Sequence, residues 1–181
     1  MSQSIISKYF ENLGGIPRDF DPNTVTRVMG FFNELNLKRT YDKFTVFESD
    51  TDEMIIGNHL KLFSFCEHHL LPFYGEVAIG YIPSGKIMGL SKFQRIVDRF
   101  SSRPQIQERL TSQVCKFIED LLNPLGVGVV VRAIHTCVFA RGTQSSQAEF
   151  TTNAMIGRFR EQQSTRHEFL SVVMSNGRNQ L

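Results

Sequence analysis

Two compact clusters of cysteine and histidine, each inside an apolar segment, constrain the fold of this chain most strongly. The first is Cys66-Glu67-His68-His69, and the second is His135-Thr136-Cys137 within the apolar run 129–140. A thiolate and an imidazole three residues apart can bind one Zn²⁺ where the backbone turns, and Pro72 favours such a turn. Zinc needs further ligands, so we expect the fold to bring the two clusters together.

The second cluster lies in a run, 127–139, that is rich in β-branched residues and is predicted to be a strand. Residues two apart in a strand point to the same face, so His135 and Cys137 are expected to face one site. A single Cys or His is more often a core residue than a ligand, but two such clusters favour a metal site. Three protein ligands and a free position would make it catalytic, whereas four ligands would make it structural.

Composition narrows the class of protein. A chain of 181 residues with 41% hydrophobic and 21% charged residues is typical of one globular domain. A net charge of +2 without a basic run gives no support for a nucleic-acid partner. No apolar run approaches the roughly 20 residues of a membrane helix. Three cysteines and the absence of a signal-peptide pattern lead us to expect a cytoplasmic protein without a disulfide framework.

The N-terminal part is predicted to be helical. A short helix over 2–13 is followed by Gly14-Gly15, and a second helix begins with Asp21 as N-cap and Pro22 at its first position. A short strand is predicted over 44–47. We therefore treat 1–53 as an N-terminal helical segment and 54–181 as the core, within one structural domain overall.

The core has alternating strand and helix patterns. Strands are predicted over 60–65, 75–82, 127–139 and 150–156, helices around 93–100 and 106–121, and a final helix capped by Ser164-Thr165. This order indicates an α+β fold with a four-stranded antiparallel sheet and two helices on one face. Cys115 lies beside the apolar stripe of the second helix, and we interpret it as a packing residue.

A phosphate site is one interpretation of the segment that opens the first core helix, Gly89-Leu90-Ser91-Lys92, with Arg95 about one turn beyond. Lys and Arg at a helix N-terminus can hold phosphate together with free backbone N–H groups. A solvated helix face explains the same residues equally well. Arg141 follows the second cluster and is a further candidate phosphate ligand near the metal.

Glu108 lies in the first turn of the second core helix and also has two interpretations. The position is favourable for a carboxylate because the N-terminal end of a helix is positive. The same carboxylate can accept two hydrogen bonds from the N1–H and N2–H₂ groups of guanine. Residue type alone does not decide between them.

Taken together, these motifs resemble the GTP cyclohydrolase I family from about Leu60 to the C-terminus. The first core helix and its surroundings match in Gly80-Tyr81-Ile82-Pro83, Gly89-Leu90-Ser91-Lys92 and Arg95-Ile96-Val97. The remaining matches are both Cys/His clusters, Gln107-Glu108-Arg109-Leu110-Thr111, Asn123-Pro124, Arg141-Gly142, Ala154-Met155-Ile156-Gly157 and Phe159-Arg160.

The resemblance implies roles for individual residues. The zinc ligands would be Cys66, His69 and Cys137, which leaves a coordination position for water. The catalytic positions would be His68, His135 and Ser91, the serine serving a later rearrangement. The substrate-binding positions would be Lys92, Arg95 and Arg141 for the triphosphate, Glu108 for the guanine, and also Gln107.

The resemblance also implies a reaction and an assembly. Zinc lowers the pKa of bound water toward roughly 7, and attack at C8 of GTP would release formate and lead to 7,8-dihydroneopterin triphosphate. The implied fold is the tunnelling fold, and the implied assembly is a decamer of two stacked pentamers with active sites at subunit interfaces. The pathway that uses the product, whether folate, biopterin or deazaguanine, stays open.

Two departures from the family pattern concern the triphosphate. Thr24 stands where the family usually has an Arg, with Arg27 available one turn later, and Glu149 brings a carboxylate close to the expected phosphate region. They keep open a related zinc hydrolase that stops at a ring-opened or formamide product. A non-catalytic zinc or purine-binding protein of the same fold is a further alternative. A zinc nucleobase deaminase is disfavoured because its His-x-Glu and Pro-Cys-x-x-Cys motifs are missing.

Overall fold

The computed structural model describes residues 11–15, 21, 23–141, 144 and 148–175. The chain divides into two compact units, Met1–Glu34 and Leu35–Leu181. The predicted boundary at 53/54 stays a prediction, and the predicted helix over 2–13 lies mostly outside the described residues. Helix α2 (Thr24–Arg39) begins slightly later than predicted. The Asp21 carboxylate lies just before this helix and accepts a hydrogen bond from the Asn23 backbone N–H at 2.8 Å.

The larger unit is built on a five-stranded sheet with the order β5-β2-β3-β6-β7. Its antiparallel strands are β2 (Ile55–Cys66), β3 (Pro72–Ile82), β6 (Gly126–His135) and β7 (Glu149–Gly157). The predicted four-stranded antiparallel core is therefore confirmed. The addition is β5 (Pro104–Gln105), which pairs in parallel with the end of β2. A strand of two residues has no periodic pattern, so it could not be predicted from the sequence.

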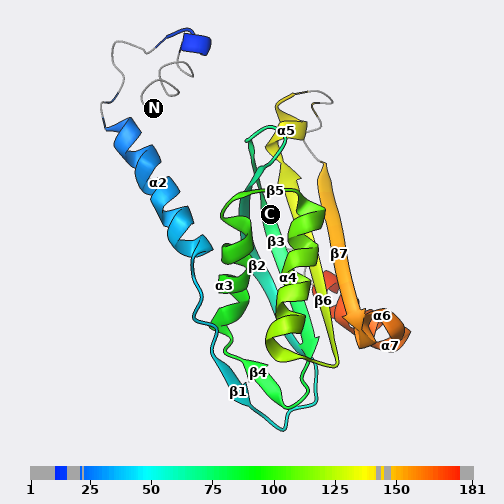
Figure 1. Ribbon diagram of the computed structural model, residues 1–181. Coiled ribbons are helices and arrows are strands. Elements are labelled where there is room, and N and C mark those ends of the chain that lie inside the picture. The colour runs from blue at the N-terminus through cyan, green and yellow to red at the C-terminus, as the bar shows by residue number, and fades with distance from the viewer. Residues whose placement is uncertain (1–10, 16–20, 22, 142–143, 145–147, 176–181) are drawn as a thin grey trace. The chain divides into compact units, whose positions relative to one another are not determined.

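Two helices cover one face of the sheet, as predicted (Figure 1). These are α3 (Ser91–Ser101) and α4 (Gln107–Leu122). Alternate residues of β3 and β6, among them Phe73, Val77, Val129 and Val131, face these helices and form the main core with them. A separate two-stranded ribbon, β1 (Val46–Glu48) with β4 (Lys86–Met88), leads into α3.

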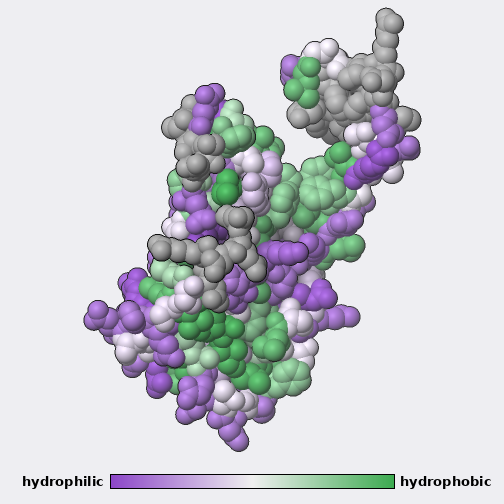
Figure 2. All heavy atoms as spheres, turned by 180° about the vertical axis from the view of Figure 1, so that it is seen from behind, coloured by the Kyte–Doolittle hydropathy of each residue, from purple (hydrophilic) through white to green (hydrophobic). Residues whose placement is uncertain are grey.

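The C-terminal helices pack on the opposite face. They are α6 (Arg158–Glu161) and α7 (Gln163–Ser175), whose Phe159 and Phe169 rings lie over Gly80 and Gly128. A Cβ atom at Gly128 would come within 2.5 Å of the Phe159 ring, so the close approach requires glycine. Seen from behind, hydrophobic side chains gather in a patch bordered by hydrophilic ones (Figure 2). No helix in the described part of the chain has the length and apolarity to cross a membrane.

One predicted strand is too long. The run predicted as a strand over 127–139 leaves the sheet at His135, and Thr136–Phe139 form the one-turn helix α5. The prediction that His135 and Cys137 share a strand face is therefore wrong. His135 is the last residue of β6 to pair with β3, opposite Phe73. The next residue turns away, with the Thr136 hydroxyl donating to the Pro72 carbonyl at 2.6 Å.

Candidate metal centre

The first Cys/His cluster forms a tight turn between β2 and β3. The Cys66 carbonyl accepts a hydrogen bond from the Leu70 N–H at 2.8 Å, and the Cys66 N–H donates to the Leu71 carbonyl at 2.8 Å. Leu70 takes a left-handed conformation with φ 54°, which lets the chain reverse within a few residues. The turn brings the side chain of His69 back beside that of Cys66.

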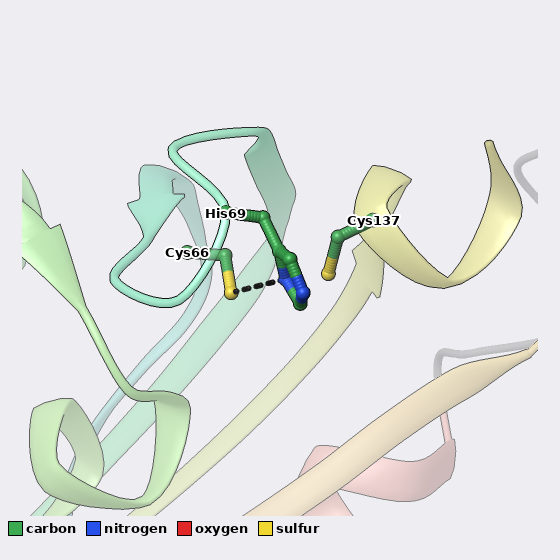
Figure 3. A group of neighbouring side chains, drawn as sticks. All are labelled: Cys66, His69 and Cys137. Atoms are coloured by element: carbon green, nitrogen blue, oxygen red, sulfur yellow. Dashed lines mark hydrogen bonds between the residues drawn. The ribbon is translucent and has the colours of Figure 1, made fainter. Parts of the chain in front are cut away.

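Three side chains of types that bind metals converge at this turn, as predicted. The donor atoms of Cys66, His69 and Cys137 all lie within 4.8 Å of one another, although Cys137 comes from α5 (Figure 3). The distance from Cys66 Sγ to His69 Nδ1 is 3.6 Å. Zinc held tetrahedrally at about 2.3 Å from sulfur and about 2.0 Å from nitrogen separates those atoms by about 3.5 Å. The donor types of the triad, and the distance between Cys66 and His69, therefore fit a zinc ion.

The side chains in and around the triad differ in their exposure to solvent. Cys66 and Cys137 are buried, whereas His68 and His69 are exposed. Burial, and then the neighbouring Cys66 thiol, raises the pKa of Cys137. His68 Nδ1 is 3.9 Å from Cys66 Sγ, and its ring lies 6.1 Å from that of His69. Among the described residues, His68 therefore borders the triad without belonging to the group of converging donors.

His135 lies at the end of β6 in an aromatic setting. Its ring stacks on Phe73 with centroids 4.4 Å apart and an interplanar angle of 4°, and the Phe150 ring meets it edge-on at 5.7 Å. Burial lowers the pKa of the His135 imidazole, and the Glu108 carboxylate opposes that shift. The ring is thus fixed in orientation, and the neutral form is favoured.

Gln107 determines which nitrogen of His135 carries the proton. The Gln107 amide nitrogen lies 2.9 Å from the Phe150 carbonyl oxygen and 3.3 Å from that of Val131. Carbonyls only accept hydrogen bonds, so the amide nitrogen belongs there and the amide oxygen points elsewhere. That oxygen, Oε1, lies 2.8 Å from His135 Nε2. In neutral His135, Nε2 therefore carries the hydrogen and Nδ1 the lone pair.

This contact was missed by the sequence reasoning, which treated Gln107 only as a substrate-binding position. Gln107 is 3% exposed, and its amide is further supported by the hydroxyl of Thr152 at 3.2 Å. Thr111 completes the network by donating to the Gln107 carbonyl at 2.7 Å. No residue spacing in the sequence signals the contact between Gln107 and His135, because this contact depends on the pairing of β6 with β7 and on the position of α4.

A charged contact supports the metal-binding turn from outside. Arg109 of α4 pairs with Glu67 of the turn and donates to the Gln105 side-chain oxygen at 3.0 Å. The Arg109 guanidinium lowers the pKa of the Glu67 carboxyl. The Glu67 backbone N–H also donates to the Gln105 carbonyl at 2.9 Å. β5 and α4 thus hold the turn against the sheet.

The predicted phosphate ligands on α3 form a separate group. Ser91 and Arg95 are exposed and Lys92 is half-buried. Gln94, on the same turn of helix, exchanges hydrogen bonds of 2.9 Å with the backbone of Lys61 in β2. Lys61 precedes Cys66 by five residues, which is about 17 Å along a strand. β4, which leads into α3, also lies at the opposite end of the sheet from α5 (Figure 1).

The structure also shows the positions of Glu149, Arg27 and Arg141, which matter for the two departures from the family pattern. Phe150 faces His135 in β7, so the neighbouring Glu149 points to the opposite face of the sheet. The guanidinium of Arg27 lies 2.6 Å from the Asp21 carboxylate, within the N-terminal unit. Arg141 is exposed and follows α5 by two residues.

These features define the class of protein: an α+β candidate metalloenzyme in which a Cys-His-Cys triad lies beside a half-buried, oriented histidine. Residues 6–174 match the family model for GTP cyclohydrolase I, and the chain therefore belongs to the GTP cyclohydrolase I family.

Similar proteins from several bacteria agree with this assignment. The GTP cyclohydrolase 1 of Chromohalobacter salexigens is 38% identical over 183 residues, covering 96% of this chain and 99% of that protein. The GTP cyclohydrolase 1 of Pseudoalteromonas translucida is 43% identical, covering 84% of each. That of Methylococcus capsulatus is 50% identical, covering 71% of this chain and 69% of that protein. The predicted fold class and enzyme class are confirmed, and GTP is the substrate that the family implies.

Proposed function

We propose that this chain is a zinc-dependent enzyme that hydrolyses GTP at C8, releases formate and forms 7,8-dihydroneopterin triphosphate. The observation that carries the proposal is the convergence of Cys66, His69 and Cys137 within 4.8 Å. A half-buried histidine, His135, is held in one tautomer by Gln107 at the end of β6. Such a pairing supports hydrolysis better than a purely structural ion, because the nearby histidines are not among the converging donors.

In this proposal, Cys66, His69 and Cys137 hold the zinc. Two thiolates and one imidazole suit Zn²⁺, and three protein ligands are typical of a catalytic site. When bound, zinc supplies a water molecule activated for attack near neutral pH. The buried cysteines exclude solvent from one side, and exposed His69 leaves the other side open to substrate.

His135 and His68 divide the proton transfers. His135 presents its Nδ1 lone pair as a base, since Nε2 donates to Gln107, and burial keeps the ring neutral near pH 7. His68 is exposed beside the triad, where it can donate a proton to N7 of the purine. Ser91 serves the later rearrangement of the ribose.

The substrate is held at its two ends. Glu108 follows Gln107 in the first turn of α4, where its carboxylate accepts hydrogen bonds from the N1–H and N2–H₂ groups of guanine. Lys92, Arg95 and Arg141 hold the triphosphate. We propose Gln107 as a positioning residue for His135, since its amide is already engaged by protein groups.

The separation between these two ends supports an active site shared by subunits. Gln94 ties the Lys92–Arg95 turn to a point about 17 Å along β2 from Cys66. This separation favours a GTP molecule that contacts the triad of one protomer and the α3 cations of another. We therefore propose that one protomer supplies the triad and another the α3 cations, within a decamer of two stacked pentamers.

The proposed reaction consumes one water overall. One water opens the imidazole ring, a second releases the formyl group as formate, and ring closure returns one. The test is to incubate zinc-loaded protein with GTP and measure formate together with pterin fluorescence. Stoichiometric formate with a fluorescent pterin is expected. Formate without fluorescence would indicate a related hydrolase that stops early, and bound zinc without formate would indicate a non-catalytic protein.

We also propose a cytoplasmic location. Cys66, Cys115 and Cys137 are all free thiols, as a reducing compartment allows. Fractionation of cells that produce the protein tests this.

A further inference from the structure

Tyr41 joins the cations of α3 into one group. The tyrosine lies in the segment between α2 and β1 and is half-buried. Its hydroxyl oxygen accepts a hydrogen bond from Lys92 Nζ at 2.8 Å. The guanidinium of Arg95 lies over its ring at 4.4 Å from the centroid. A third cation of the same helix, Arg99, donates to the Tyr41 backbone carbonyl.

Tyr41 is itself held in place by neutral groups. Lys92 can only donate, so the Tyr41 hydroxyl proton goes to the Lys43 carbonyl, 2.7 Å away. The Tyr41 ring meets Phe44 edge-on at 5.3 Å, and Phe44 meets Phe117 of α4 at 4.9 Å. This aromatic chain fixes the ring, and with it the two cations, relative to the core.

A tyrosine orders cations without cancelling their charge. A carboxylate in its place would neutralise one of them, whereas the phenol and the ring face attract cations and leave the net charge intact. Among the described residues, none of the ion pairs includes Lys92, Arg95 or Arg99. Neighbouring Asp98 accepts instead from Gln94, at 2.9 Å. The face of α3 that meets Tyr41 therefore keeps its positive charge for an anionic ligand.

We propose that Tyr41 is a positioning residue that holds Lys92 and Arg95 as a preformed clamp for the polyphosphate tail of the substrate. The inference rests on the proposed function, in which these two cations bind the triphosphate. Ordering two long side chains before binding removes a cost that would otherwise weaken the complex. The role is indirect, because Tyr41 acts through the two cations and not through contact with the reacting atoms.

Two variants separate the parts of the contact. Tyr41→Phe keeps the ring under Arg95 but loses the hydroxyl that Lys92 contacts, and Tyr41→Leu loses both. Calorimetry with inorganic tripolyphosphate on the zinc-loaded protein is expected to show a loss of affinity of about threefold for Tyr41→Phe and about tenfold for Tyr41→Leu. Tyr74→Phe, at another partly exposed tyrosine on β3, is the matched control and is expected to bind like the unmodified protein.

Kinetics distinguish positioning from general damage. The KM for GTP is expected to rise by the same factors with kcat changed less than about twofold, since kcat reports the bound complex. Inhibition by guanosine, which lacks phosphate, is expected to stay unchanged. Unchanged tripolyphosphate affinity in Tyr41→Leu would overturn the proposal, as would a loss of guanosine binding equal to that of tripolyphosphate.

The inference and the proposed function can fail separately. Tripolyphosphate binding that depends on Tyr41 and Lys92, in a protein that releases no formate from GTP, would support the clamp and contradict the proposed reaction. Formate release with a tripolyphosphate affinity that Lys92→Ala does not alter would support the reaction and overturn the clamp.

Discussion

Two regions of this molecule contain buried thiols, but the atoms that surround these thiols differ. Cys115 in α4 is 2% exposed and packs among core residues, with its sulfur 4.0 Å from the Val127 carbonyl. Cys66 and Cys137 are also buried, but their sulfur atoms converge with His69 at the edge of the sheet. Burial raises the pKa of Cys115, to about 12, and also that of Cys137.

Neither residue type nor burial alone makes a metal site. What separates the two regions is the number of donor atoms that meet. Cys115 meets a carbonyl and apolar side chains, so its thiol stays protonated and unreactive. Cys137 meets a second thiol and an imidazole, and a divalent cation favours the thiolate form of such a set.

The largest effect is expected from Cys137→Ser. Replacing a thiolate by a weakly acidic hydroxyl removes one of three ligands, so zinc is lost and formate release is expected to fall by roughly a thousandfold or more. Metal analysis and the formate assay measure both. Cys115→Ser makes the same chemical change in the other region and is expected to keep full zinc content. Equal zinc in the two variants would contradict the distinction.

Gln107→Met tests whether the site also depends on hydrogen bonds around the triad. Methionine has a similar length but cannot accept from His135 Nε2–H, so kcat is expected to fall roughly 10- to 100-fold with zinc retained. Nitrogen chemical shifts of the His135 ring report the tautomer directly. Gln107→Glu keeps an acceptor at the same place and is expected to retain the Nε2–H tautomer. A kcat in Gln107→Met equal to that of the unmodified protein would remove Gln107 from the mechanism.

The pKa of Cys115 predicts a pH dependence of stability. Because the folded-state pKa, about 12, exceeds the unfolded value near 9, the folded state retains a proton that the unfolded state loses between these pH values. The stabilisation is complete below about pH 9 and declines above it, by up to about 1.4 kcal/mol per pH unit. Urea unfolding from pH 8 to 10 is expected to show a steeper loss for the unmodified protein than for Cys115→Ala. An equal loss of stability with pH in both proteins would contradict the raised pKa of Cys115.

The smallest effect is expected from Cys115→Ala at neutral pH. Removing a buried sulfur leaves a small cavity, so the free energy of unfolding is expected to fall by about 1 kcal/mol. GTP turnover is expected to stay unchanged, because Cys115 belongs to the packed core and not to the triad. Loss of turnover without loss of stability would show that this region contributes to function after all.

The sequence predicted which candidate ligands would meet better than it predicted their local structure. Cys66, His69 and Cys137 were identified from residue type and from the resemblance, and the structure brings them together. The reasoning that placed Cys137 on a strand was wrong, because the apolar run 127–139 looks uniform while the sheet pairing ends at His135. Where a strand ends depends on its partner, and a single segment does not encode that.

Other features depended on contacts between distant segments. Gln107 reaches His135 only because α4 lies across β6 and β7, and Tyr41 reaches Lys92 only because its segment passes beside α3. Neither pair has a periodic signature. Cys115, by contrast, was predicted as a packing residue from the apolar stripe of its helix, and its burial confirms that.

The hydrogen bond from Thr136 to the Pro72 carbonyl joins the two halves of the metal site through protein atoms alone. Small zinc modules collapse when a chelator strips them, because their folding depends on the ion. Here the sheet already fixes the site, so the stripped polypeptide is expected to stay folded and to take the ion up again without refolding. Under the proposed zinc dependence, activity would then follow the supply of the ion, with no need for new protein synthesis.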